Sequence, residues 1–187
     1  MNGEKSTSHA GAFRRNRLAL ALTGALLLAL PAAAEESGGI TLGFGQLTQT
    51  RQDVESKGWI GEVGFAGRVS DDTFIVGDFQ FAIDAEHSDL THLSLSFTGG
   101  YALGPEWFTY WIGGGIRLGL DGYPNPSFSY PDLGLATGIA MIFGGYGFGA
   151  DVRGWLGWNW YCDRVTEEIS MGFDPYLEWR VYVIVGF

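Results

Sequence analysis

The stretch YLEWRVYVIVGF, at Tyr176–Phe187, decides the fold of this chain. From Leu177 onward every second residue is apolar. The residues between them are Glu178, Arg180, Tyr182, Ile184 and Gly186. Successive side chains of a β-strand point to opposite faces, so this strand has one fully apolar face and one mostly polar face. The stretch ends on an aromatic residue of the apolar face, and we expect such a strand to close a membrane barrel.

Residues 1–34 have the pattern of a secretory signal peptide. A basic stretch precedes the apolar run Leu18–Leu30, and the small residues of PAAA at 31–34 follow it. The apolar run is too short for a membrane-spanning helix, which needs about 20 residues. We therefore predict cleavage before Glu35 and a single mature barrel domain at residues 35–187.

Charge and cysteine content exclude several classes of partner and cross-link. The chain carries 21 acidic residues against 11 basic residues, for a formal net charge of −10. Nucleic acids and anionic surfaces select for Lys and Arg, so neither is an expected partner. Cys162 is the single cysteine, which excludes an intrachain disulfide. We predict no cofactor.

Alternation with period two recurs in eight segments of the chain. They lie at residues 40–45, 59–69, 75–84, 92–98, 108–121, 133–143, 146–159 and 176–187. The last segment is placed after Pro175, because proline cannot donate a hydrogen bond to a strand ladder. No helical stripe competes with this pattern, so we predict an all-β fold, an eight-stranded antiparallel up-and-down transmembrane β-barrel.

The predicted links between strands alternate in length. The long links are Gln49–Lys57, Asp84–Asp89, Asp121–Asp132 and Asp163–Glu168, and the short links are Ser70–Asp72, Gly104–Glu106 and Gly144–Gly145. This alternation is typical of bacterial barrels with short periplasmic turns and longer outer loops. Aromatic residues near the strand ends are predicted to form two interfacial girdles. They are Trp59, Phe74, Trp107, Phe108, Tyr146, Trp158, Trp160 and Phe187.

A soluble lipocalin-type barrel or a β-sandwich is the alternative fold, and it would need a polar exterior. Here the polar face combines small residues with charges of both signs, which favours a tight lumen. Residues 39–187 resemble the small eight-stranded outer-membrane barrels of the OmpA-transmembrane, OmpX and opacity-protein type. The resemblance implies a bacterial outer-membrane location, contact with outer-membrane lipid, and a role of Phe187 as a signal to the barrel-assembly machinery. Members of this group differ in function, so the fold alone does not predict one.

Eight charged residues lie on the predicted lumenal face. They are Glu62, Arg68, Asp78, Arg117, Asp151, Arg153, Glu178 and Arg180. The numbers of acids and bases are equal, so we expect ion pairing, with Asp151 and Arg153 set against Glu178 and Arg180 on the neighbouring strand. Such pairs form either a static plug or the switch of a gated pore. An eight-stranded interior has room for side chains alone, and this favours the plug.

Three other groups of residues are candidates for chemistry or binding. His92-Leu93-Ser94 with Glu106 is similar to the motif of lipid A deacylases of the outer membrane, but Ser94 and Glu106 are expected at opposite ends of one strand, too far apart for catalysis. His87 among acidic neighbours is a weak metal candidate, and Cys162 receives no role.

The third group lies in the longest outer link, DGYPNPSFSYPD at Asp121–Asp132, which presents Tyr123, Phe128 and Tyr130 on a backbone restrained by prolines. These aromatic residues are candidates either for contact with an extracellular ligand or for a lid over the barrel. We predict a protein without enzymatic activity that has a structural or surface-contact role. A narrow pore for small solutes and a lipid A-modifying enzyme are the alternatives.

Overall fold

The computed structural model describes residues 37–51, 54–85, 90–121, 127–129, 131–162 and 169–186. All described residues lie in one compact unit within residues 34–187. The predicted signal peptide, residues 1–34, lies outside the described residues, and its cleavage stays a prediction. The described residues contain no helix that is long and apolar enough to cross a membrane.

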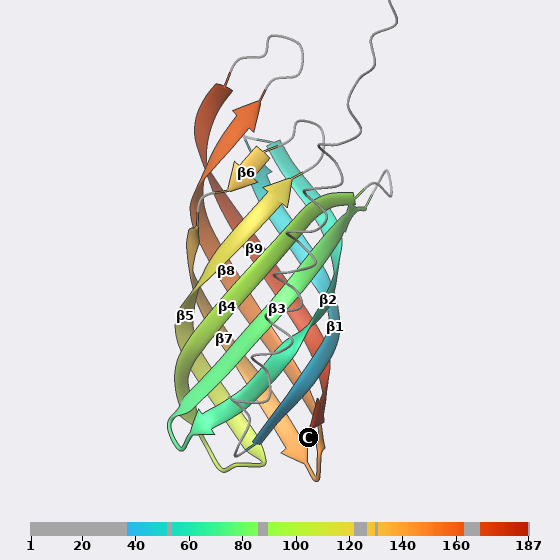
Figure 1. Cartoon of the computed structure of the whole chain (residues 1–187), viewed down its shortest axis with the longest axis vertical. Coiled ribbons are helices and arrows are strands. Elements are labelled where there is room, and N and C mark those ends of the chain that lie inside the picture. The colour runs from blue at the N-terminus through green and yellow to red at the C-terminus, as the bar shows by residue number, and fades with distance from the viewer. Residues whose placement is uncertain are drawn as a thin grey trace, which may run out of the picture. The chain divides into compact units, whose positions relative to one another are not determined.

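Eight long antiparallel strands form a closed barrel wall, and a ninth strand is very short (Figure 1). The strands are β1 (Ser37–Arg51), β2 (Val54–Ser70), β3 (Thr73–Asp84), β4 (Leu90–Leu103), β5 (Phe108–Asp121), β6 (Ser127–Ser129), β7 (Asp132–Phe143), β8 (Tyr146–Cys162) and β9 (Ile169–Gly186). Each long strand pairs with the next one along the chain, and β9 pairs with β1 from Gly39↔Gly186 to Gln49↔Tyr176. This pairing closes the barrel and confirms the predicted eight-stranded fold.

The alternation in the sequence is realised as an apolar exterior and an interior of buried side chains. Large apolar side chains stand exposed on the outward positions of every long strand, and we call this surface the apolar belt. Its members include Leu42, Phe44, Val63, Phe81, Phe97, Ile116, Leu135, Phe148, Val152, Leu177 and Val183. The inward positions between them are buried. Each strand therefore has the apolar face outward, the reverse of a soluble barrel.

The two ends of the barrel differ in their connections. At the turn end, short turns join β2 to β3, β4 to β5 and β7 to β8. At the loop end lie the two-residue connection of β1 to β2 and the longer connections at residues 85–89, 122–131 and 163–168. Gly144 and Gly145 make the β7–β8 turn with φ angles of 54° and 91°. A two-residue hairpin turn with two positive φ angles matches the twist of the flanking strands, and glycine adopts it without strain.

The loop-end boundaries of several strands differ from the prediction. Residues predicted as the link Gln49–Lys57 belong mostly to strands, since β1 runs to Arg51 and β2 begins at Val54. The last strand begins at Ile169, so its predicted start after Pro175 is wrong. The pairing of β9 with β1 ends at Tyr176, and from Pro175 outward only β8 is paired with β9. Proline is tolerated on such a one-sided strand because no ladder bond is lost on the open side.

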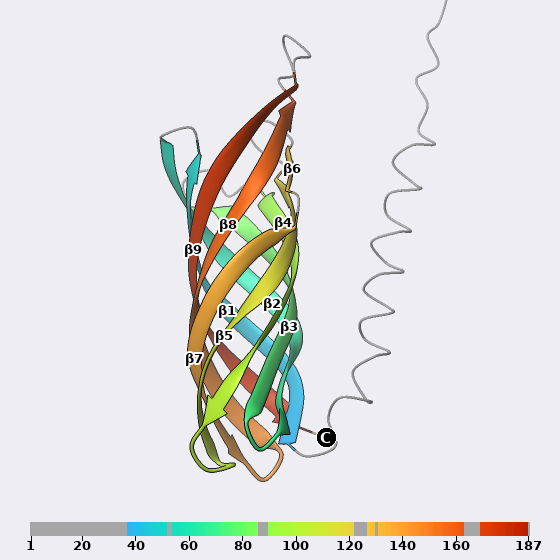
Figure 2. The ribbon, with the colours of Figure 1, turned by 90° about the vertical axis from the view of Figure 1, so that its left-hand side faces the viewer.

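The β8–β9 hairpin extends beyond the other strands at the loop end, as Figure 2 shows. The short strand β6 pairs with β5 at Leu120–Asp121 and with β8 at Asn159–Tyr161, so it continues the wall beyond the start of β7. β6 was not predicted, because three residues are too few to show a period.

Candidate functional site

Inward positions near the middle of four strands bring six charged side chains together in the lumen. We call this group the central ionic layer. It consists of Glu62 from β2, Asp78 from β3, Asp151 and Arg153 from β8, and Glu178 and Arg180 from β9. None of the six is more than 5% exposed. The layer follows from the registers, which set Asp151 opposite Arg180 and Arg153 opposite Glu178, the cross-strand neighbours that the sequence predicted.

Arg180 is the centre of the layer. Its Nε lies 2.8 Å from Asp151 Oδ1 and its Nη2 lies 2.5 Å from Asp151 Oδ2, which is a two-pronged pair. Its Nη1 donates to Asp78 Oδ2 at 2.8 Å and also to Glu62 Oε2. Planar guanidinium groups hold carboxylates in this way with fixed geometry. One side chain of β9 thus ties together β2, β3 and β8.

Arg153 connects the same carboxylates from the neighbouring strand. Its Nη1 donates to Asp78 Oδ2 at 2.8 Å and to the Ser96 hydroxyl at 2.7 Å, and its Nη2 donates to Asp151 Oδ2 at 3.1 Å. Its Nε lies 3.9 Å from Glu178 Oε1. Asp78 and Asp151 therefore each touch both arginines.

The acids outnumber the bases in the central ionic layer, four to two. Asp78 and Asp151 each accept three hydrogen bonds from these partners and Ser96. Glu62 Oε1 and Glu178 Oε2 have no hydrogen-bond partner among the described residues. The equal pairing expected from the sequence therefore does not hold within this layer, because two of the eight predicted residues lie elsewhere.

Those two residues are Arg68 and Arg117. Arg68 lies at the turn end, where it donates to the backbone carbonyl groups of Asp71 and Gly104. Arg117 pairs with the buried Asp132 through Nη2 at 2.9 Å, and its guanidinium lies 3.9 Å from the centre of the Tyr176 ring. Asp132 was predicted as the end of a loop. The alternation of the following strand, extended back by one residue, would have placed its side chain in the lumen.

Clusters of buried apolar side chains lie in the lumen on both sides of the central ionic layer. The turn-side cluster consists of Ala66, Phe74, Val76, Ala102, Trp111, Ala136, Ala140, Tyr182 and Ile184. The loop-side cluster consists of Leu47, Ile60, Ala82, Trp155 and Tyr176. Phe74 was predicted in an interfacial girdle, but it is 0% exposed and stacks on Trp111 at 5.7 Å between ring centres. That prediction is wrong because Phe74 is an even number of residues from Asp78 on the same strand, so both side chains point into the lumen.

The candidate hydrolase residues are not brought together. His92 and Ser94 are buried in the lumen, where the Ser94 hydroxyl donates to Gln80 Oε1 at 3.2 Å and His92 lies beside the Tyr176 ring. Glu106 is exposed in the turn between β4 and β5, at the other end of the barrel. A catalytic triad requires direct contact, so this motif does not form one.

Several other candidates fall where the structure says nothing of their side chains. His87, Tyr123, Tyr130 and Phe187 lie outside the described residues, as do the side chains of Phe128 and Cys162. Within the described part of the chain, no group of three or more His, Cys, Asp or Glu side chains is arranged to hold a metal ion.

Comparison with known proteins supports the fold. No protein-family model matches the chain, and no curated protein matches it. The crystal structure of Neisserial surface protein A (NspA) is similar to this chain, with a TM-score of 0.57 and 14% sequence identity. The match covers 80% of this chain and 97% of that one. At 14% sequence identity, this similarity confirms the barrel fold and gives no information about activity.

Proposed function

We propose that this chain is an integral protein of a bacterial outer membrane with a structural or surface-contact role, no enzymatic activity, and a lumen closed by its own side chains. The short turns would then face the periplasm and the long loops the exterior. Phe187 would help present the last strand to the barrel-assembly machinery. Tyr123, Phe128 and Tyr130 remain the proposed contact residues for an extracellular ligand.

One observation carries this proposal. The exterior of the barrel is apolar on every long strand, while the charges of the central ionic layer are buried inside. A protein in water gains nothing from such an arrangement, because exposed apolar area costs about 25 cal/mol per Å². A bilayer removes that cost, and a closed barrel leaves no backbone hydrogen-bonding group open to lipid.

A closed lumen is supported by the three layers that lie in series along it. Trp111 in the turn-side cluster, Arg180 in the ionic layer and Trp155 in the loop-side cluster are each at most 1% exposed. Eight-stranded barrels have interiors that side chains can fill completely. The proposed surface-contact role is supported by the similarity in fold to NspA, which is named as a surface protein of Neisseria.

Two measurements test the proposal. The purified chain is expected to insert into liposomes and to run at a different apparent size on gels before and after heating. A chain that stays soluble and monomeric without detergent would overturn the membrane location. The inserted protein is then studied in planar bilayers, where we expect no discrete channel openings. Regular single-channel openings would replace the closed lumen with the narrow-pore alternative.

A further inference from the structure

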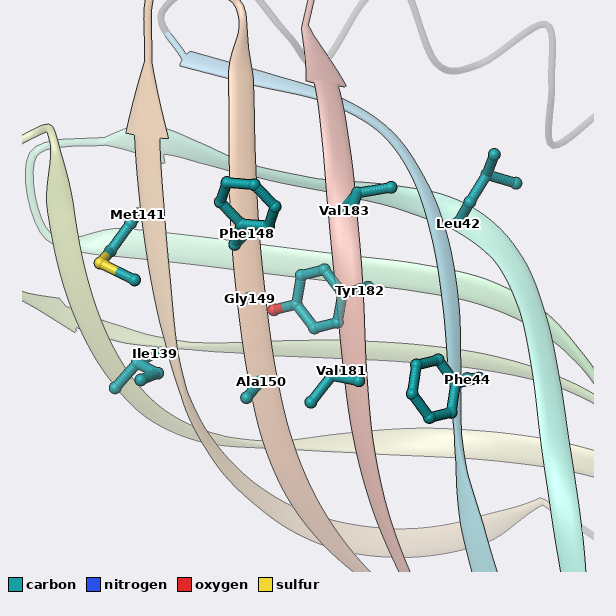
Figure 3. Close-up of a pocket in the computed structure, with 10 residues that line it drawn as sticks. All are labelled: Leu42, Phe44, Ile139, Met141, Phe148, Gly149, Ala150, Val181, Tyr182 and Val183. Atoms are coloured by element: carbon teal, nitrogen blue, oxygen red, sulfur yellow. The ribbon is translucent and has the colours of Figure 1, made fainter.

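The apolar belt is not uniform, and one depression in it spans four strands. Two parallel rows of outward side chains define it. Each of the four strands contributes one residue to each row. The row nearer the turn end is Met141, Phe148, Val183 and Leu42, and the next row is Ile139, Ala150, Val181 and Phe44 (Figure 3). Together they line a pocket of about 310 Å³ on the outer surface.

The depression exists because Ala150 is small where its neighbours are large. Ile139 and Val181 stand on either side of Ala150 in the same row, and Phe148 stands next to it on the same strand. Gly149 lies between the rows and carries no side chain. The Tyr182 ring packs against Gly149 from the lumen side, in the space that a Cβ there would occupy (Figure 3).

We propose that this groove, formed around Ala150 on β7, β8, β9 and β1, binds an acyl chain of a phospholipid in the periplasmic leaflet. The inference rests on the proposed membrane location. Its outward side chains are aliphatic or aromatic, with the Met141 thioether as their only heteroatom. Such a lining offers no charged partner for a headgroup but complements a hydrocarbon chain.

The position of the groove selects this occupant. Its walls, Phe148, Leu42 and Val183, are exposed members of the apolar belt, so the groove is continuous with the surface that faces hydrocarbon. Phe148 lies two residues from Tyr146, where β8 begins at the turn end. The turn end is the proposed periplasmic end, where phospholipid forms the leaflet. The volume is about ten times the ~30 Å³ of one water molecule, enough for a segment of one chain.

Filling the depression tests the proposal. The Ala150→Phe variant places a ring where the acyl chain would lie, and its side chain points away from the barrel interior. Val152→Phe is the matched control, because Val152 is an exposed outward residue of the same strand that does not line the groove. Each protein is incubated with dioleoylphosphatidylglycerol in detergent, and lipid retained after detergent exchange is measured by native mass spectrometry.

We expect one retained phospholipid on the natural chain and on Val152→Phe, and roughly tenfold weaker retention on Ala150→Phe, as the loss of contact with about two methylene groups implies. Equal retention on all three proteins would overturn the groove as the site. In a second incubation, lipopolysaccharide is added in equal amount to the phospholipid, and preferential retention of lipopolysaccharide would overturn the occupant. A chain that inserts into liposomes but retains no lipid contradicts this inference alone, whereas a chain that does not insert contradicts the proposed function as well.

Discussion

At the scale of single residues, the hydrogen bonds of the central ionic layer distinguish its four carboxyl groups. Asp151 faces arginine N–H groups with both oxygens, at 2.8 Å through Oδ1 and at 2.5 Å and 3.1 Å through Oδ2. Asparagine at this position would place an N–H₂ group against a guanidinium donor. We expect Asp151→Asn to lower the free energy of unfolding by about 3–5 kcal/mol, as when a buried pair loses one partner. Urea unfolding in lipid vesicles measures the change.

Glu178→Gln is the matched comparison within the same layer. Glu178 Oε1 has the Gln80 amide at 3.4 Å and Arg153 Nε at 3.9 Å, and its Oε2 has no hydrogen-bond partner among the described residues. Glutamine keeps one oxygen and removes a charge from a layer in which acids are in excess. We expect a change within about 1 kcal/mol. If Glu178→Gln destabilises the barrel as much as Asp151→Asn does, the two carboxyl groups contribute equally to stability. The distinction drawn from their hydrogen bonds is then wrong.

Asp72, in the exposed turn between β2 and β3, gives a prediction about pH. Hydrogen bonds from Ser70 Oγ at 2.8 Å and Thr73 Oγ1 at 3.1 Å lower the pKa of the Asp72 carboxyl below its ordinary value. A lowered pKa in the folded state means stabilisation that is present above the ordinary pKa and is lost as the pH falls through the folded value. Asp72→Asn should therefore be less stable than the natural chain at neutral pH and equally stable in acid. A stability difference that does not change across a pH series would contradict this.

Residue parity, the odd or even position of a residue along its strand, shows how much of the site the sequence could predict. Glu178 and Arg180 face Asp151 and Arg153 as their spacing predicted, because parity within a strand fixes the face of the sheet. Parity cannot say how far a side chain reaches. Arg68 reaches toward the turn and Arg117 toward Asp132, so neither joins the layer. These choices depend on distances across the lumen, which no local pattern contains.

At the scale of the elements, the β7–β8 turn isolates the effect of backbone strain. An added Cβ at Gly145 would meet nothing within 4 Å, and its φ is 91°. Gly145→Ala should therefore lower the free energy of unfolding by roughly 1–2 kcal/mol through the backbone alone. Gly144→Asn is the control, since asparagine tolerates a φ near the 54° of Gly144. Equal losses in both variants would contradict φ at Gly145 as the cause.

The boundaries of the strands were the least predictable part of the fold. Period two and turn residues placed the turn end correctly, because those turns are short and two of them contain glycines with positive φ. At the loop end, β9 passes through Pro175 and β6 forms from three residues. Whether a strand continues there depends on which neighbour is present to pair with it. That information lies in the partner strands β8 and β5 and not in the local pattern of the segment itself.

At the scale of the whole molecule, the lumen contains three successive layers of side chains. Two are held by apolar packing, and the one between them is held by ion pairs. The two apolar clusters flank the arginines and carboxylates, and an apolar surrounding of low dielectric constant strengthens the electrostatic attraction between such charges. The ionic layer in turn connects β2, β3, β8 and β9 across the barrel. In the proposed closed lumen, a path for solutes would require displacement of all three layers, because they follow one another along the axis.

Truncation of single layers tests this arrangement. Trp111→Ala removes the stacked partner of Phe74 and should cost about 3–5 kcal/mol of stability, and Trp155→Ala should cost a similar amount in the loop-side cluster. Neither variant should conduct ions, since the ionic layer and the other cluster remain in the path. The variants are inserted in planar bilayers at equal protein density, with a large porin as the conducting control. Discrete openings from either single variant would mean that one tryptophan alone closes the lumen, and the series of layers would then be the wrong account.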